Sequence, residues 1–291
     1  MPYQIFTDSS TDLSTQQRKD NNIEYLRMGI NVNGKDYHAD LDYEEFNLEE
    51  LYGWIKDPKV VIKTSLITFA EVFDKFEPFL KKGIDILYIG CSSALSGSVN
   101  SVRLACDELL ESYPGRKIIG IDSRRADMSL GLMCIDASKM QREGKSLEEV
   151  AEWVENNKQT YHEIGSLDNL SYLRAMGRVS GPSAFFGNLI GIKPLIMFNR
   201  KGENYAYNKV RGMRAAMEES VNYIKMNMVP GVTEIVYVGS IMGDSYQAYM
   251  KEHIEKELGI KVETFNIGPI VGTGVGPGMY GCFFRGKEVN V

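Results

Sequence analysis

The chain has 291 residues, of which 43% are hydrophobic and 25% charged, so it can form one large or two ordinary globular domains with a sizeable core. Its formal net charge of −6 argues against nucleic acid as the main partner, because the phosphate backbone binds basic surfaces. No apolar run approaches the length of about 18 residues that a membrane-spanning helix needs, so no transmembrane segment is predicted.

The cysteines and histidines predict no metal site. The four cysteines lack the C-x-x-C spacing of a zinc site, and we expect them to be small core residues in a reducing compartment. The N-terminus has no charged-then-apolar secretory pattern, so we expect the protein in the cytoplasm. None of the three histidines has a metal-ligand spacing to another. These residues are Cys91, Cys106, Cys134, Cys282, His38, His162 and His253.

Apolar periodicity in the first 160 residues predicts strands that alternate with helices. Asn33 and Gly34 predict a type I′ turn inside a hairpin over residues 23–37. Three helix starts combine an N-cap residue with Glu three positions later, the pattern of a capping box, at Asn47 and Glu50, Thr68 and Glu71, and Ser146 and Glu149. Strands are predicted at 4–6, 60–62, 84–89 and 117–121, and helices at 47–54, 72–80 and 99–110 and from residues 126 and 146.

Small hydroxyl residues follow the predicted strands of this half. The strand at 84–89 leads into the polar loop 90–98, and then into a helix. Ligands of open α/β sheets bind at the carboxyl ends of the strands. The hydroxyls and free N–H groups of such a turn suit a single anionic group, and the alternative is that Ser96 or Ser98 is only a helix N-cap. Comparable strand ends are residues 8–12, Thr64 and Ser65, and Asp122 and Ser123.

A domain boundary is predicted near residue 160, giving domains of residues 1–160 and 161–291. The second part again mixes strands and helices, and it closes with five glycines in residues 268–278, which indicate tight backbone around a ligand or another segment. Strands are predicted at 162–167, 193–198, 204–209, 234–238, 260–266 and 279–284, and helices at 170–176, 213–228 and 245–258.

Several catalytic motifs are present only in part. Residues 29–36 and 281–288 match most of a Walker loop, but both lack the Ser or Thr after Lys that the metal needs. Residues 90–94 resemble a nucleophile elbow without its final glycine. A serine hydrolase acting on acyl esters through Ser92 or Ser96 stays open as an alternative, but one of the three histidines would have to reach the serine by folding.

Seven segments in order resemble the DegV family, the bacterial fatty-acid-binding proteins that present acyl chains to a fatty acid kinase. Together they span nearly the whole chain, as one unit over residues 3–285. The segments are residues 8–13, Thr64 with Ser65, residues 92–98, Asp122 with Ser123, Leu173 through Gly177 to Ser180, Lys193 with Pro194, and residues 268–278.

The resemblance implies a two-domain α/β fold, with an N-terminal parallel-sheet domain and a C-terminal domain with a mixed sheet. It implies a palmitate-like fatty acid between the domains, its carboxylate held by Thr64 and Ser96. It also implies no catalysis, no cofactor besides the fatty acid, and a separate kinase as partner. Further ligand-binding residues are expected at Ser65, Ser93, Gly97, Thr273 and Gly274, and kinase docking at Arg174 and Arg178.

Two positions depart from the family pattern. Ile67 stands where the family often has Pro, and Gly274 stands where it often has a His close to the head group. Because a backbone glycine does not titrate near neutral pH, we expect fatty-acid affinity to depend little on pH. The remaining alternative is a sensor of a small anionic metabolite, which would take a short polar ligand in the same cleft.

Overall fold

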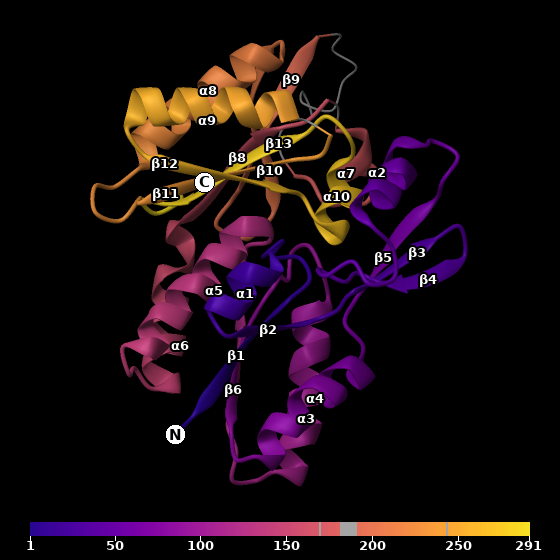
Figure 1. Cartoon of the computed structure of the whole chain (residues 1–291), viewed down its shortest axis with the longest axis vertical. Helices are drawn as coiled ribbons and strands as arrows, with labels where there is room; N and C mark the ends of the chain where they lie inside the picture. The colour runs from indigo at the N-terminus through magenta and orange to yellow at the C-terminus, as the bar shows by residue number, and fades with distance from the viewer. Residues whose placement is uncertain (169, 181–190, 243) are drawn as a thin grey trace.

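The computed structural model describes residues 1–168, 170–180, 191–242 and 244–291 (Figure 1). Its strands form a four-stranded, a three-stranded and a six-stranded sheet. The first two sheets come from the N-terminal half of the chain and the third from the C-terminal half, and the sheet changes between β7, which ends at Asp122, and β8, which begins at Tyr161. No helix within the described residues is long and apolar enough to cross a membrane.

The four-stranded sheet is entirely parallel, with the order β2-β1-β6-β7. The apolar runs of β1 and β6 are buried at every position, as strands covered on both faces should be. Helices α3 and α4 pack on one side and α5 and α6 on the other. The elements are β1 (Tyr3–Asp8), α1 (Thr15–Asp20), β2 (Ile23–Leu26), α3 (Phe69–Lys81), β6 (Asp85–Gly90), α4 (Ser98–Ser112), β7 (Ile118–Asp122), α5 (Asp127–Arg142) and α6 (Leu147–Asn157).

The three-stranded sheet is antiparallel and corrects the hairpin predicted over residues 23–37. It has the order β4-β3-β5, with β3 (Gly29–Val32), β4 (Lys35–His38) and β5 (Ile62–Ser65), and α2 (Leu48–Lys56) lies nearby. The type I′ turn is confirmed, because Asn33 and Gly34 have φ values of 51° and 90°. However, the hairpin covers only β3 and β4, since β2 pairs with β1. The strand that carries Thr64 therefore lies outside the parallel sheet.

One predicted capping box forms only in half. Thr68 accepts the Glu71 backbone N–H at 3.2 Å, but the Glu71 carboxylate does not return to the Thr68 backbone. It accepts instead the backbone N–H, Nε and Nη2 of Arg27, at 3.0, 3.0 and 2.9 Å. A bidentate pair between two charged groups is stronger than a single bond from a backbone N–H to the carboxylate, so the tertiary contact prevails. The boxes at Asn47 and Ser146 form completely.

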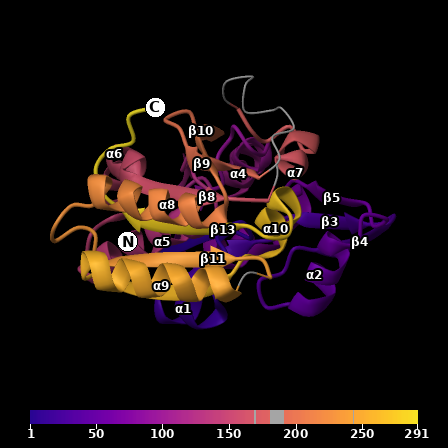
Figure 2. The ribbon, with the colours of Figure 1, turned by 90° about the horizontal axis from the view of Figure 1, so that it is seen from above.

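The six-stranded sheet is mixed, as predicted, with the order β10-β9-β8-β13-β11-β12 and one parallel pair, β11 with β12. Helices α8 and α9 lie side by side on one face (Figure 2), and α5 packs against β8 and β13. The elements are β8 (Tyr161–Ser166), α7 (Ser171–Ala175), β9 (Ile192–Phe198), β10 (Asn204–Arg211), α8 (Met213–Asn227), β11 (Ile235–Ser240), α9 (Asp244–Leu258), β12 (Lys261–Asn266), α10 (Pro269–Val275) and β13 (Tyr280–Arg285), with a 3-10 turn at Lys158–Thr160.

The glycine-rich segment is mostly a helix, where a tight loop was expected. Pro269 opens α10, a position that tolerates the missing N–H, and the Gly272 and Gly276 backbones close helical bonds to Gly268 and Gly272. Gly276 at φ 77° then ends the helix.

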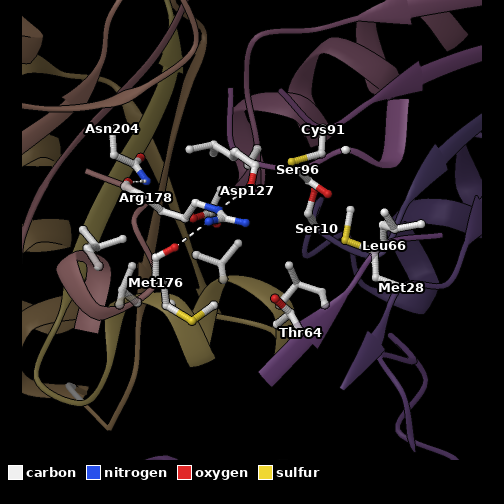
Figure 3. Close-up of a pocket in the computed structure, with 18 of the residues that line it drawn as sticks. Ser10, Met28, Thr64, Leu66, Cys91, Ser96, Asp127, Met176, Arg178 and Asn204 are labelled. Atoms are coloured by element: carbon white, nitrogen blue, oxygen red, sulfur yellow. Dashed lines mark hydrogen bonds between the residues drawn. The ribbon is translucent and has the colours of Figure 1, made fainter. Parts of the chain in front are cut away.

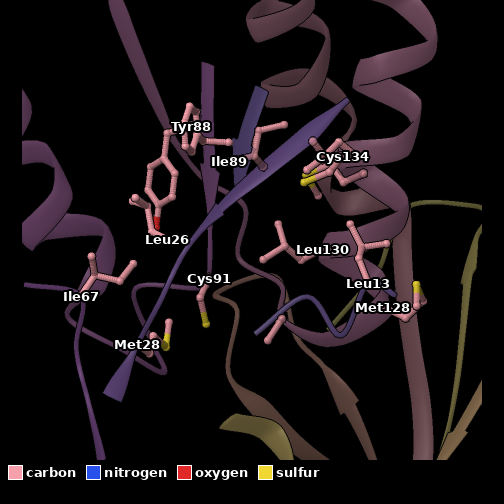
Figure 4. Packing of buried hydrophobic residues seen from close by; sticks show 14 of the residues in the cluster. Leu13, Leu26, Met28, Ile67, Tyr88, Ile89, Cys91, Met128, Leu130 and Cys134 are labelled. Atoms are coloured by element: carbon pink, nitrogen blue, oxygen red, sulfur yellow. The ribbon is translucent and has the colours of Figure 1, made fainter. Parts of the chain in front are cut away.

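A continuous hydrophobic core joins the two halves. Helix α5 contacts β1 on one side and β8 and β13 on the other, so its side chains belong to both. Its buried Met128, Leu130 and Cys134 pack with Leu13 and Ile89 of the N-terminal half (Figure 4). The same cluster includes Phe283 of β13. The two sheets are therefore held at a fixed spacing, and the site described next lies between them.

Candidate ligand-binding cavity

A cavity of about 380 Å³ lies between the two halves of the chain (Figure 3). Each of the four parallel strands is followed, in the segment after its carboxyl end, by at least one residue of this wall. Among them are Met28 after β2, Ser10 after β1, Cys91 after β6 and Asp127 after β7. The position agrees with the rule that open α/β sheets bind ligands at strand carboxyl ends.

The remaining wall combines a few polar groups with many apolar side chains. Thr64 and Ser65 come from β5, and Ser96 and Gly97 from the loop before α4. The apolar lining residues are Leu66, Leu95, Ala126, Leu173, Met176, Phe198, Ile270, Val271 and Val275. An apolar cavity with a few converging polar groups is the usual form of a small-molecule site.

Thr64 and Ser96 are two half-buried hydroxyls on this wall. Within the described residues, the Thr64 hydroxyl makes no hydrogen bond, and so it is free to donate to a ligand. Ser96 Oγ accepts the Ser98 N–H at 3.2 Å and lies 2.9 Å from Ser98 Oγ. The N-cap of α4 is Gly97, with no side-chain cap bond, so neither Ser96 nor Ser98 caps the helix. The capping alternative is therefore wrong.

Two of the predicted site residues lie off the cavity wall. Ser93 donates its hydroxyl to Asp122 Oδ2 at 2.6 Å and faces solvent. Thr273 donates to the Ile270 carbonyl at 2.9 Å, one turn back in α10. Gly274 does line the cavity, and a Cβ built on it meets nothing within 4 Å, so the space beside it is open.

The arginines predicted to dock a partner differ in their positions. Gly177 at φ 66° ends α7 between them. The Gly177 and Arg178 N–H groups bond to the Arg174 and Leu173 carbonyls, at 3.0 and 2.8 Å, in a Schellman arrangement. Arg174 stays on the helix and is exposed, whereas Arg178 lines the cavity, with its Nε 2.6 Å from the Leu95 carbonyl. The two side chains therefore do not share one helix face.

Two buried carboxyl groups on the wall were not singled out from the sequence. Asp127 begins α5 and Glu163 lies on β8. Burial raises the pKa of Asp127 to about 7, and burial together with the Asp127 charge raises the pKa of Glu163 well above its usual range. The neighbouring Asp12, whose carboxylate oxygens have no hydrogen-bond partner within the described residues, also has a raised pKa through burial and Asp127. Only the fold reveals this cluster, because its members lie far apart in the sequence.

The groups needed by a serine hydrolase are not assembled. Ser92 is fully buried and donates its hydroxyl to the Gly202 carbonyl at 2.8 Å. His38 pairs with Glu45, the His162 ring bonds the Tyr223 hydroxyl and the Lys287 carbonyl, and His253 bonds the Tyr249 carbonyl. Among the described residues that line the cavity there is no histidine. Nor do the described residues contain a group of three or more potential metal ligands.

Comparison with known proteins decides the family. A family model described as the DegV family of uncharacterised proteins matches residues 2–287. This chain belongs to the DegV family. A DegV domain-containing protein of Clostridium perfringens, CPE0026, is 31% identical over 283 residues, which cover 97% of each chain. A second one from that organism, CPE0304, is 28% identical over 277 residues, covering 95% of this chain and 96% of the other.

Solved structures of DegV proteins share the fold over nearly their whole length. A DegV family protein from Thermus thermophilus, described as fatty-acid binding, aligns with a TM-score of 0.87 and 24% identity over 98% of this chain and all of that one. A protein from Eubacterium ventriosum described as binding stearic acid aligns with a TM-score of 0.84 and 23% identity, over 97% of this chain and 98% of that one. The two-part fold of this DegV protein is therefore that of its family.

Proposed function

We propose that this DegV protein binds one long-chain, palmitate-like fatty acid between its two domains, residues 1–160 and 161–291, and presents it to a separate fatty acid kinase in the cytoplasm. The ligand carboxylate meets the hydroxyls of Thr64 and Ser96 beside the N-terminus of α4. Ser65, Gly97 and Gly274 complete this polar end of the site. The protein itself contributes binding and orientation and no catalytic step.

The single observation that supports this proposal most is the composition of the cavity wall. The hydroxyls of Thr64 and Ser96 line the wall, the N-terminus of α4 nearby favours negative charge, and the rest of the wall is mainly apolar. That combination suits a molecule with one anionic end and a long hydrocarbon tail. DegV proteins described as binding stearic and heptadecanoic acids share this fold.

Burial of the tail supplies most of the expected affinity. A saturated tail of about 14 methylenes gains up to roughly 11 kcal/mol at about 0.8 kcal/mol per buried methylene. Each charge-assisted hydrogen bond to the carboxylate adds only about 1.5–3 kcal/mol. The hydroxyls therefore fix the direction of the ligand, while the hydrocarbon determines how tightly it is held.

The two rival functions fit the site less well. A serine hydrolase needs a base beside its nucleophile, and Ser92 is bonded to a backbone carbonyl instead. The short polar ligand of a sensor of a small anionic metabolite would leave the mainly apolar wall without a partner and would bring negative charge toward Asp127 and Glu163, which are buried on the same wall. A fatty acid has one anionic group, and the rest of its length carries no charge.

Protein purified from a bacterial host is expected to carry about one fatty acid per chain, because the apolar cavity favours an acyl tail over water. The check is to denature the purified protein, extract it with organic solvent and analyse the extract by mass spectrometry. An extract free of lipid, from protein that also fails to take up added long-chain fatty acid, would refute the carrier function. Turnover of a nitrophenyl acyl ester would favour the hydrolase.

Affinity for fatty acid is expected to fall as the pH rises from about 6 to about 8, by up to about tenfold for one linked proton. Asp127, whose pKa is raised to about 7, is neutral at the lower pH and ionised at the higher. The ionised carboxylate repels the anionic ligand and disfavours an apolar tail, so binding is stronger where Asp127 is protonated. This expectation replaces the weak pH dependence that the sequence suggested from Gly274.

Displacement of a fluorescent fatty acid measures this pH dependence, with Asp127→Asn as the matched control. The asparagine keeps the size of the side chain and cannot ionise, so the variant should show a flatter pH profile. Equal slopes for wild type and Asp127→Asn would assign the pH dependence to the ligand's own titration and contradict the role of Asp127.

Docking of the kinase is proposed at the exposed end of α7. Reversal of charge at Arg174 is expected to reduce kinase-dependent phosphorylation of the bound acid without changing lipid binding, because Arg174 is exposed and does not line the cavity. Arg178→Glu is expected to impair both, since its side chain lines the cavity. The control is Arg214→Glu on α8, an exposed arginine elsewhere on the surface. Normal phosphorylation of the Arg174→Glu protein would remove this residue from the interface.

A further inference from the structure

The cavity contains two buried carboxyl groups that a plain hydrocarbon tail cannot satisfy. Asp127 and Glu163 are 2% and 9% exposed, and both line the cavity. Within the described residues, Glu163 forms no hydrogen bond or ion pair through its side chain. Asp127 Oδ1 accepts the N–H of the next residue, Met128, at 3.2 Å, and the Asp127 carboxyl lies beside that of the buried Asp12. Burial of polar groups without partners costs free energy, so such groups usually mark a missing partner.

The backbone fixes the direction of both side chains. On β8, the ring of His162 packs against Tyr223 of α8, which covers one face of the sheet. Successive strand residues point to opposite faces, so Glu163 points to the other face, where the cavity lies. Asp127 has φ 60°, and its N–H is bonded to the carbonyl of Ser10 at 2.6 Å, which places it beside another residue of the wall.

A buried cation nearby does not neutralise the pair. The Arg125 guanidinium is fully buried, and its hydrogen bonds go to the Tyr161, Arg124 and Asn199 carbonyls and to Gln159 Oε1. It forms no ion pair with Glu163. Its charge nevertheless lies close enough to lower the pKa of Glu163, against the larger effect of burial. Arg125 already brings a positive charge near the pair, so a neutral polar group that can donate and accept is the partner that fits the remaining place.

From this geometry we propose that Asp127 and Glu163 form a subsite for a hydroxyl group on the acyl chain, so that the preferred ligand is a hydroxylated long-chain fatty acid. A hydroxyl can both donate and accept, so it pairs with a carboxylate or a protonated carboxyl alike. An unsubstituted chain leaves the Glu163 carboxyl unpaired, and sites that hydrogen-bond a ligand hydroxyl discriminate strongly against the analogue that lacks it. This inference rests on the fatty-acid function proposed above.

The test compares affinities within one series of eighteen-carbon saturated acids. One member is unsubstituted, and the others carry a single hydroxyl near the head group, at mid-chain or near the methyl end. At least one hydroxylated acid is expected to bind about tenfold or more tightly than the unsubstituted acid. In Glu163→Met and Asp127→Leu that advantage should fall to within about twofold. Glu111→Gln, an exposed carboxylate on α4 outside the cavity, should keep it.

The possible outcomes separate this inference from the proposed function. Tight binding of the unsubstituted acid with no gain for any hydroxylated acid would overturn the subsite and leave the carrier function intact. Failure to bind any member would overturn both. A hydroxyl preference that persists in both cavity variants would overturn the assignment to these two residues. Because the wild-type comparison needs no substitution, a variant that fails to fold does not prevent a decision.

Discussion

The double variant Thr64→Val and Ser96→Ala is expected to bind long-chain fatty acid roughly 100-fold more weakly than wild type, with each single change costing about 1–3 kcal/mol. Each substitution removes a hydroxyl that we propose donates to the ligand carboxylate, and it leaves the size of the side chain almost unchanged. The loss should appear in titrations with a fluorescent fatty acid, at a pH where the ligand is ionised.

The two predicted site residues that lie off the cavity wall provide matched controls. Ser93→Ala and Thr273→Val remove hydroxyls of the same types, whose partners are Asp122 and the Ile270 carbonyl. Both variants should bind as wild type does. Equal losses of affinity in all four single variants would show that removing any of these hydroxyls weakens binding through a loss of protein stability. The ligand carboxylate would then not depend on Thr64 and Ser96 in particular. Melting of the lipid-free proteins should change little for Ser96→Ala, because Gly97 and not Ser96 is the N-cap of α4.

Replacement of Arg125 by methionine is expected to lower the free energy of unfolding by about 3–5 kcal/mol. Its guanidinium binds the carbonyl of Tyr161 at 2.7 Å and that of Asn199 at 3.4 Å, so one side chain connects the loop after β7 to β8 and the end of β9. Methionine fills a similar volume but leaves these buried carbonyls without a donor. The nearby carboxyl of Glu163 also loses the positive charge that lowers its pKa, which adds to the cost.

Arg124→Met is the control for this change. Arg124 is the exposed neighbour, and its Nη1 bonds the Arg200 carbonyl at the surface, so removing it should cost less than about 1 kcal/mol. Thermal and denaturant unfolding of both variants measure the difference. Similar midpoints for Arg125→Met and wild type would mean that water or neighbouring groups replace the guanidinium, and that Arg125 does not hold the two halves together.

Local pattern and the family resemblance together named residues that share one cavity wall. The loop after β6 and the residues Thr64, Ser65, Ser96 and Gly97 were expected near a ligand, and the structure brings these four to one cavity. Ser93 and Thr273 belong to the same segments but turn to other partners, because alternation and helical rotation send neighbouring side chains in different directions. Whether the four residues hold a fatty acid stays a prediction.

Tertiary contacts explain the two features that were predicted wrongly from the local sequence. Glu71 carries the signal of a capping box, but Arg27 reaches it from another segment of the chain and forms a bidentate pair. A hairpin was predicted over residues 23–37, but its first strand, β2, pairs instead with β1 in the parallel sheet. The hydrogen bonds of β2 are buried there. In both cases, the local preference contributes a small free energy, and a contact that forms only in the folded chain contributes more.

The sequence by itself determined the alternation of strands and helices, the positions of most helix starts, and the hydroxyl-rich strand ends. These follow from apolar periodicity and capping, which act between residues a few positions apart. Only the tertiary structure decided that Asp127 and Glu163 share one wall with Thr64 and Ser96, and that Arg125 is buried against carbonyls of the other half. The physical reason is that burial and the resulting pKa shifts depend on which distant segments meet, and local sequence does not specify this.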